Sequence, residues 1–219
     1  MYDRRLDGKV LSFGHAGILY KQSFVMYDRN TESLWVHVTG MAEYGPMQGK
    51  RLTFMPSTVT SWGKWKKDYP HTKVLPGYRR GGFMGTYEGI DHYNDDLGLL
   101  VLVRFKPKLY PFEALQKRGL VNDQFNGKEV LVFYSKKDKT ATAWDRKVDG
   151  QSLTFQMDDQ KDKYGSQLIR DDQTGSLWSW LTGEAVAGKL KETLLKQLPY
   201  NPILNARFHG FYPDAPVFQ

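Results

Sequence analysis

Hydrophobic residues in this chain come in short runs, and residues that favour turns separate the runs. Within the first 55 residues, runs rich in β-branched, aromatic or alternating apolar residues cover positions 9–13, 24–27, 34–38 and 51–55. Runs of this length and composition are typical of β-strands. The Asp-Gly pairs at 7–8 and 149–150 favour tight hairpin turns, because both residue types tolerate positive φ. The pattern predicts a mainly β protein with minor α, that is, a β-rich α+β fold.

The same pattern occurs twice along the chain. Residues 27–75 align without a gap on residues 170–218 at a constant offset of 143, and 14 of these 49 positions are identical. Upstream, the Asp-Arg and Asp-Gly motifs of the two copies match at an offset of 142. We therefore expect two pseudo-equivalent repeats of antiparallel strands plus a short helix each. The expected boundaries are an N-terminally incomplete repeat one over 1–78, a connection over 79–98 and a complete repeat two over 99–219.

Short helices are predicted over 62–67, over its counterpart 205–211, and over 112–118. Ser61 can cap the first of them, and Pro70 forbids its continuation. Residues 187–198 also have helix-forming composition, whereas their counterpart 47–55 has the pattern of a turn plus a strand. Both interpretations of this segment stay open.

The composition is sufficient for a hydrophobic core and excludes sites that depend on cysteine. Hydrophobic residues make up 40% of it and aromatic residues 14%, which is ample for a folded domain. There is no cysteine, so disulfides, thiolate nucleophiles and Cys-based metal sites are excluded. The longest apolar run, 97–103, is far shorter than the ~20 residues of a membrane helix, and no apolar signal-peptide core follows the first residues. We expect a soluble domain with no membrane span.

The formal net charge of +7 comes mainly from the first half of the chain. Residues 1–110 carry 16 basic and 10 acidic side chains, whereas residues 111–219 carry 15 and 14. A basic surface attracts nucleic acid, acidic polysaccharide or anionic membrane, and it is also typical of an ordinary solvated face. Charge alone does not choose among them.

Asp28 and Trp35 recur in both repeats, as Asp171 and Trp178. An Asp that starts a hairpin turn bonds its own backbone, and a strand Trp buries a large apolar area, so a structural role explains both. The alternative is a ligand site in which Asp28 orients a hydroxyl group and Trp35 stacks on an apolar ring face. Arg29 and Tyr27, beside Asp28, belong to this candidate site.

His37 lies two residues after Trp35, on the same predicted strand face, and its repeat partner is Trp180. A residue that departs from the repeat is free of the structural role that the repeat imposes. His15, which Gly14 and Gly17 flank, can approach from the neighbouring strand. The candidate ligand-binding residues are therefore Trp35, His37, His15, Arg29, Asp28 and Tyr27.

Basic and aromatic residues alternate around the first predicted helix, as on surfaces that bind single-stranded nucleic acid. However, Trp62 and Trp65 are spaced i and i+3, which is the spacing of a stripe that faces the core. This spacing predicts that the tryptophans are buried and that Lys64, Lys66 and Lys67 point outward. Nucleic acid is therefore not the expected partner.

No metal or cofactor site is expected. The five histidines have no short metal-binding spacing, and the acidic group Asp91, His92, Asp95 and Asp96 lacks the Gly and the terminal Glu of a calcium loop. The glycines at 81, 82 and 85 fit a connection better than a phosphate-binding loop. No Gly-x-Ser-x-Gly motif or recognisable Ser/His/Asp arrangement is present, so no catalytic residue is identified.

A series of short motifs resembles one known family. In order, the chain carries Val25-Met26-Tyr27-Asp28-Arg29, Thr31-Glu32-Ser33-Leu34-Trp35, Thr39-Gly40, Trp62, Trp65 and Lys73-Val74-Leu75. Together these resemble the family of domains of unknown function numbered 3179. The resemblance implies an exported protein, extracellular or periplasmic, made of two related halves.

The chain also departs from that family. The family's first half usually has a Tyr-Cys-Pro-Leu-Cys segment before the Asp-Arg motif, and the equivalent segment of the second half here, 134–138, has no cysteine. Any chemistry of those cysteines is therefore not shared. If the halves are equal, about 40 residues of the first half are absent, which predicts an unpaired strand edge and a homodimer formed through it.

The expected function is non-catalytic recognition of an extracellular polymer or a small polar ligand, at the seam where the two repeats meet. The alternative is an enzyme, either a carboxylate-based hydrolase or a His-centred metal enzyme. The sequence identifies neither the ligand nor a reaction.

Overall fold

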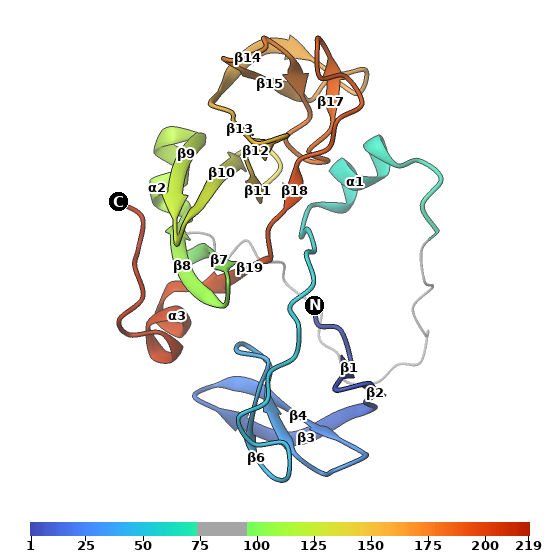
Figure 1. The fold of residues 1–219 in the computed structure, drawn as a ribbon, viewed down its shortest axis with the longest axis vertical. Helices are drawn as coiled ribbons and strands as arrows, with labels where there is room; N and C mark the ends of the chain where they lie inside the picture. The colour runs from blue at the N-terminus through green and yellow to red at the C-terminus, as the bar shows by residue number, and fades with distance from the viewer. Residues whose placement is uncertain (74–95) are drawn as a thin grey trace.

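The computed structural model describes residues 1–73 and 96–219, and we call these two parts the first half and the second half. The protein is β-rich, with several antiparallel sheets and short helices, which confirms the predicted fold class (Figure 1). Most of the predicted connection 79–98, with Gly81, Gly82, Gly85, Asp91, His92 and Asp95, lies outside the described residues.

Each half contains a four-stranded antiparallel sheet whose strands follow the order of the chain. In the first half, the strands are β3 (Phe13–Tyr20), β4 (Ser23–Asp28), β5 (Leu34–Val36) and β6 (Met41–Tyr44). In the second half, they are β14 (Phe155–Lys161), β15 (Gln167–Asp171), β16 (Leu177–Trp178) and β17 (Ala185–Ala187). The two sheets lie at opposite ends of the view in Figure 1.

The strand pairings correspond at the offsets of the sequence alignment. Phe13 pairs with Asp28 in one sheet, and Phe155 pairs with Asp171 in the other. A two-stranded hairpin precedes each sheet, formed by β1 (Arg5–Leu6) with β2 (Lys9–Val10) and by β12 (Lys147–Val148) with β13 (Gln151–Ser152). The Asp-Gly pairs at 7–8 and 149–150 have positive φ and form the predicted turns of these hairpins.

Two further sheets of the second half contain most of the remaining core. One has the order β19 (Tyr200–Leu204), β7 (Leu97–Val103), β8 (Lys106–Pro111). The other has the order β18 (Lys196–Gln197), β11 (Thr140–Asp145), β10 (Lys128–Ser135), β9 (Leu120–Phe125). The helix α2 (Phe112–Arg118) packs its buried Phe112 and Leu115 into a core with residues of β7 and β10. Every residue of β7 is buried, as expected of a central strand that packs on both faces.

The predicted short helices are confirmed as α1 (Trp62–Asp68), α2 and α3 (Asn205–Phe211). Ser61 caps α1, because its Oγ accepts a hydrogen bond from the Lys64 amide at 3.2 Å. The helical alternative for 187–198 is wrong, since this segment contains turns, an isolated bridge at Leu194 and the strand β18. Tertiary packing overrides local propensity there: Gly188 has a φ of +93°, and a Cβ on it would lie 2.6 Å from Ser176 Cα.

The predicted orientation of α1 is wrong for Trp62 and Lys64, whereas Lys66 and Lys67 are exposed as predicted. Trp62 is 51% exposed, whereas Lys64 is only 6% exposed. The i and i+3 spacing of the tryptophans predicts a core-facing stripe, but it is the side of α1 that carries Lys64 that faces the protein. Trp65 stacks on Tyr69 with ring centroids 4.2 Å apart, so these aromatic residues pack on each other.

The helix that ends each half lies against the other half. Three side-chain hydrogen bonds fix the segment before α1 to the second half: one between the hydroxyl groups of Thr58 and Tyr200 at 2.7 Å, one from Gln197 Nε2 to Thr58 Oγ1 at 2.9 Å, and one between the hydroxyl groups of Thr60 and Thr140 at 2.9 Å. In return, Lys21 Nζ in the β3–β4 turn donates to the Gly210 carbonyl at the end of α3, at 3.0 Å. In Figure 1, α1 is drawn next to β17 and β18, far from β3 and β4. This exchange places α1 at the seam between the halves.

No helix within residues 1–73 or 96–219 combines the length and the apolar character needed to cross a membrane.

Candidate functional site

A cavity of about 700 Å³ lies at this seam, between α1 and the second half. Three elements surround it: the lysine face of α1, the turn between β10 and β11 (residues 135–138), and the hairpin loop between β14 and β15 (residues 162–166). Gln116 of α2 and Trp180 also line it. Its volume is within the range of cavities that hold small-molecule ligands. We call it the basic cavity, for the reason given next.

Lysine dominates the lining of the basic cavity. Five lysines line it: Lys64 and Lys67 from α1, Lys136 and Lys137 from the β10–β11 turn, and Lys161 from β14. The one acidic residue in the lining is Asp138, whose Oδ2 accepts a hydrogen bond from Ser135 Oγ at 2.7 Å. The carboxylate of Asp138 is therefore engaged in holding its own turn. The lining keeps a formal excess of positive charge.

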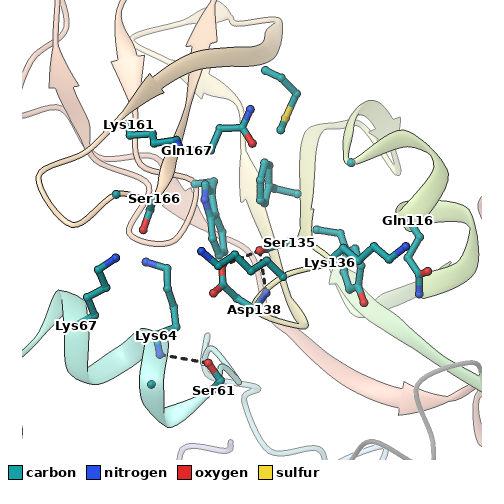
Figure 2. Close-up of a pocket in the computed structure, with 18 residues that line it drawn as sticks. Ser61, Lys64, Lys67, Gln116, Ser135, Lys136, Asp138, Lys161, Ser166 and Gln167 are labelled. Atoms are coloured by element: carbon teal, nitrogen blue, oxygen red, sulfur yellow. Dashed lines mark hydrogen bonds between the residues drawn. The ribbon is translucent and has the colours of Figure 1, made fainter.

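Two of these lysines, Lys64 and Lys67, point toward one space. Figure 2 shows Lys64 and Lys67 rising from α1 toward the loop that carries Ser166, whereas Lys136 extends from the β10–β11 turn toward Gln116 on the other side of the cavity. Like charges that gather in a partly enclosed space repel one another and focus a positive potential there. An anion that enters this space would relieve the repulsion and meet several donors at once.

Lys64 is the most buried of the five. Its Nζ lies 5.6 Å from the centroid of the Trp180 ring, at cation–π distance. Trp180 in turn stacks on Phe133, with ring centroids 4.6 Å apart and an interplanar angle of 17°. The rings form a rigid floor that supports a charge which is costly to remove from water.

The loop opposite α1 is preformed. Asp162 Oδ1 accepts hydrogen bonds from the amides of Tyr164 and Ser166, both at 2.8 Å. Between them, Gly165 has a φ of +76°, and a Cβ on it would lie 3.4 Å from Lys67 Nζ. A glycine here satisfies the backbone and lets the lysine of α1 approach the loop.

Sequence reasoning missed this site because it assigned the wrong face of α1 to the core. The signal that could have found it is the i, i+3 spacing of Lys64 and Lys67, which places both ammonium groups on one helix face. The partners of that face, at 136–137 and 161, are about 70 to 100 positions away in the sequence and become neighbours only in the fold.

The structure gives Asp28 and Trp35 a structural role. Both are fully buried, and Asp28 Oδ2 accepts hydrogen bonds from Trp35 Nε1 at 2.9 Å and from Thr31 Oγ1 at 2.7 Å. The same pair recurs at Asp171 and Trp178, also at 2.9 Å. Neither Asp28 nor Trp35 has accessible surface through which it could contact a ligand.

The pKa of Asp28 reflects this environment. Burial by itself raises the pKa of a carboxyl, but the hydrogen bonds from Trp35, from the Thr31 hydroxyl and from the amides of Thr31 and Asn30 together hold the pKa of Asp28 below its ordinary value. The carboxylate is therefore the form that the fold stabilises.

The other candidate residues lie near one another, away from the basic cavity. His15 and His37 both contact Phe24, with ring centroids 4.6 Å and 5.8 Å away, and burial lowers the pKa of His37. The Arg29 guanidinium lies 5.3 Å from the centroid of the Tyr27 ring. None of these four residues lines the basic cavity, and their role in ligand binding stays a prediction.

Within residues 1–73 and 96–219, no group of three or more His, Cys, Asp or Glu side chains is placed to hold a metal ion. Of the acidic cluster considered from sequence, Asp96 belongs to these residues.

Comparison with known proteins gives a family and no activity. The model of the family DUF3179, a protein of unknown function, matches residues 1–97 and again residues 91–219. Neither a curated protein nor a solved structure matches the chain. Because the two matches together span its whole length, the chain belongs to the DUF3179 family of proteins of unknown function.

Proposed function

We propose that this protein recognises a small anionic ligand, one that bears a carboxylate or a phosphate group, in the basic cavity. The observation that carries the proposal is that Lys64 and Lys67 point together into a cavity that three further lysines also line (Figure 2). This proposal keeps the expected function, recognition of a polar ligand at the seam of the two halves, and gives the ligand a charge.

A purely structural role explains the lysines poorly. A solvated basic face keeps its ammonium groups apart and in water, whereas Lys64 is buried against Trp180 and faces further lysines across a cavity. Five ammonium groups around one cavity create a positive potential there, and an anion that binds in the cavity would relieve their mutual repulsion.

The position of the cavity also suits recognition. Its walls come from α1, which belongs to the first half, and from four segments of the second half. A bound anion would therefore connect the two halves and stabilise their arrangement, as any ligand does that binds only the folded state.

The test is binding of citrate, inorganic phosphate and sulfate, measured by calorimetry and by thermal stabilisation. In Lys67→Gln we expect affinity to fall about tenfold to a hundredfold, because one hydrogen bond to a charged group contributes about 1.5–3 kcal/mol. Lys9→Gln is the matched control, since Lys9 is exposed on β2 and does not line the cavity. An equal loss in both variants, or no anion bound by the wild type, would refute the proposal.

The residues that line the basic cavity do not favour the alternative that the protein is a carboxylate-based hydrolase. A hydrolase that uses paired carboxylates needs two of them beside the substrate. The basic cavity presents one carboxylate, Asp138, which Ser135 already engages. We therefore propose recognition rather than hydrolysis at this site.

Two further expectations are proposals that need their own measurements. Export to the extracellular space or periplasm is tested by fractionation of cells that express the full natural gene. Homodimer formation through an unpaired strand edge is tested by light scattering, where a strictly monomeric mass would count against it.

A further inference from the structure

A second cavity lies beside the basic cavity, on the other face of the β14–β15 hairpin. Its volume is about 570 Å³, and Lys161 lines both cavities. Helix α1 borders both as well: Lys64 and Lys67 line the basic cavity, and Tyr69, which ends the helix, lines the second one. We call it the polar cavity.

The chemistry changes from one cavity to the other. The polar cavity has hydroxyl groups from Tyr69, Tyr164, Ser179 and Thr182, and it has two carboxylates, Asp162 and Glu184, beside the two lysines Lys161 and Lys163. Its formal charge is therefore balanced, in contrast to the basic cavity. Hydroxyl groups and carboxylates together bind a neutral ligand that is rich in hydroxyl groups, because the ligand can both donate and accept.

An aromatic surface borders the polar cavity. Tyr69 is 38% exposed and stacks on Trp65 with an interplanar angle of 25°. A supported, partly exposed ring of this kind suits the apolar face of a sugar ring, which carries its hydroxyl groups at the edge. The polar cavity thus offers both features by which proteins hold uncharged sugars.

Taking the proposed anion binding as its basis, we infer that the ligand is an oligosaccharide with an acidic unit at one end. The acid group occupies the basic cavity, and the uncharged units continue past Lys161 into the polar cavity. The acid group is a carboxylate, as in a uronic acid, or a phosphate ester on the terminal sugar.

The carboxylates of the polar cavity decide against a uniformly charged polymer. A single-stranded nucleic acid carries a phosphate at every unit, and Asp162 and Glu184 would repel the phosphates that follow the first. An oligosaccharide with its charge at one end meets lysines at that end and carboxylates only along its hydroxyl groups. The two cavities therefore favour a ligand whose charge is as unevenly distributed as their own.

The test compares four ligands by calorimetry: glucuronic acid, a trisaccharide that ends in glucuronate, the same trisaccharide with a terminal phosphate in place of the uronate, and a single-stranded oligonucleotide. We expect both acidic trisaccharides to bind at least tenfold more tightly than glucuronic acid. The ratio between the two trisaccharides identifies which acid group the basic cavity prefers.

Two variants separate the two cavities. Lys67→Gln should weaken binding of glucuronic acid and of the trisaccharides alike. Tyr69→Ala should weaken only the trisaccharides, by about tenfold, and leave glucuronic acid unchanged. Because Tyr69 packs on Trp65, Glu184→Gln is the second test of the polar cavity: this exposed side chain should be removable without loss of folding, with the same selective effect.

The outcomes distinguish the inference from the proposed function. If glucuronic acid binds and the trisaccharides bind no more tightly, or if Tyr69→Ala and Glu184→Gln both leave trisaccharide binding unchanged, the inference fails and anion binding stands. Tighter binding of the oligonucleotide than of any saccharide would also overturn the inference. If no acidic ligand binds, anion binding fails and the inference fails with it.

Discussion

Asp28→Asn tests whether the buried carboxylate stabilises the fold or serves a ligand. Asp28 accepts four hydrogen bonds: from the amides of Thr31 at 2.6 Å and Asn30 at 3.1 Å to Oδ1, and from Thr31 Oγ1 at 2.7 Å and Trp35 Nε1 at 2.9 Å to Oδ2. The substitution keeps the shape of the side chain and replaces one oxygen by an NH₂ group. The substitution therefore removes one hydrogen-bond acceptor from a side chain whose four partners all donate to it.

The asparagine has one favourable orientation. Its oxygen has to face the two backbone amides, so its NH₂ group faces the Trp35 indole and the Thr31 hydroxyl. The hydroxyl can rotate and accept, because Ser33 Oγ lies 2.7 Å away as a second partner. The Trp35 indole N–H can only donate, so it stays buried without an acceptor.

The loss of free energy follows from these contacts. A buried donor left without an acceptor costs about 1–3 kcal/mol, and the remaining bonds weaken because they are no longer charge-assisted. We expect the free energy of unfolding to fall by about 2–4 kcal/mol, which for a chain of this size lowers Tm by about 5–12 °C. Urea unfolding and calorimetry measure both quantities.

The repeat and the neighbouring residue provide controls. Asp171→Asn should cost about as much, because Asp171 accepts from Trp178 Nε1 at 2.9 Å and from the Thr174 amide at 2.6 Å. Asp172→Asn, at an exposed position, should cost less than about 0.5 kcal/mol. Anion binding should survive in Asp28→Asn. Loss of binding with unchanged stability would refute the structural assignment of Asp28.

The lowered pKa of Asp28 adds a pH dependence with a defined sign. The unfolded chain has an ordinary Asp with a pKa of about 3.9, so the stabilisation is fully present above that pH and is lost as pH falls through the lower folded-state pKa. Asp28→Asn carries no titrating group at this position. The difference in stability between wild type and variant should therefore shrink as pH falls below about 4, and a difference that grows there would contradict the assignment.

Two further substitutions separate stability from function elsewhere. Lys64→Met should weaken anion binding at least tenfold, because it keeps an apolar side chain beside Trp180 and removes one positive charge from the cavity; a folded variant that binds anions normally in calorimetry would contradict the site. Gly188→Ala should cost about 2–4 kcal/mol, since it combines positive φ with a Cβ 2.6 Å from Ser176 Cα, whereas Gly150→Ala, at positive φ but with open space around it, should cost about 1 kcal/mol; equal losses in urea unfolding would show that the close approach is unimportant.

Local features of the fold could be predicted from the sequence because their causes are local. Ser61 and Pro70 lie at the two ends of α1, and the Asp-Gly pairs at 7–8 and 149–150 form their turns, since each depends on residues within one or two turns of chain. The face that α1 presents to the protein depends on its partner instead. Trp180, which Lys64 contacts, is 116 positions away in the sequence, and the sequence of the helix does not predict this contact.

The difference between the two copies at position 37 points to the site. His37 is a candidate because its counterpart in the other copy, Trp180, is a different residue type. In the structure it is Trp180 that lines the basic cavity, where its ring lies beneath Lys64. A departure from a repeat marks both copies of a position, and it does not say which copy has the function.

Packing explains why the two copies differ at this position. Gln167, which lines the basic cavity, corresponds to Phe24 in the first half, and the Phe24 ring contacts both His15 and His37. In the first half, Phe24 therefore packs against His37, which is the counterpart of Trp180. In the second half, Gln167 takes the place of Phe24 and leaves room beside Trp180. Gln167→Phe should therefore reduce the volume of the basic cavity and weaken anion binding while the fold is retained. Undiminished binding in a folded Gln167→Phe variant would show that the anion sits elsewhere.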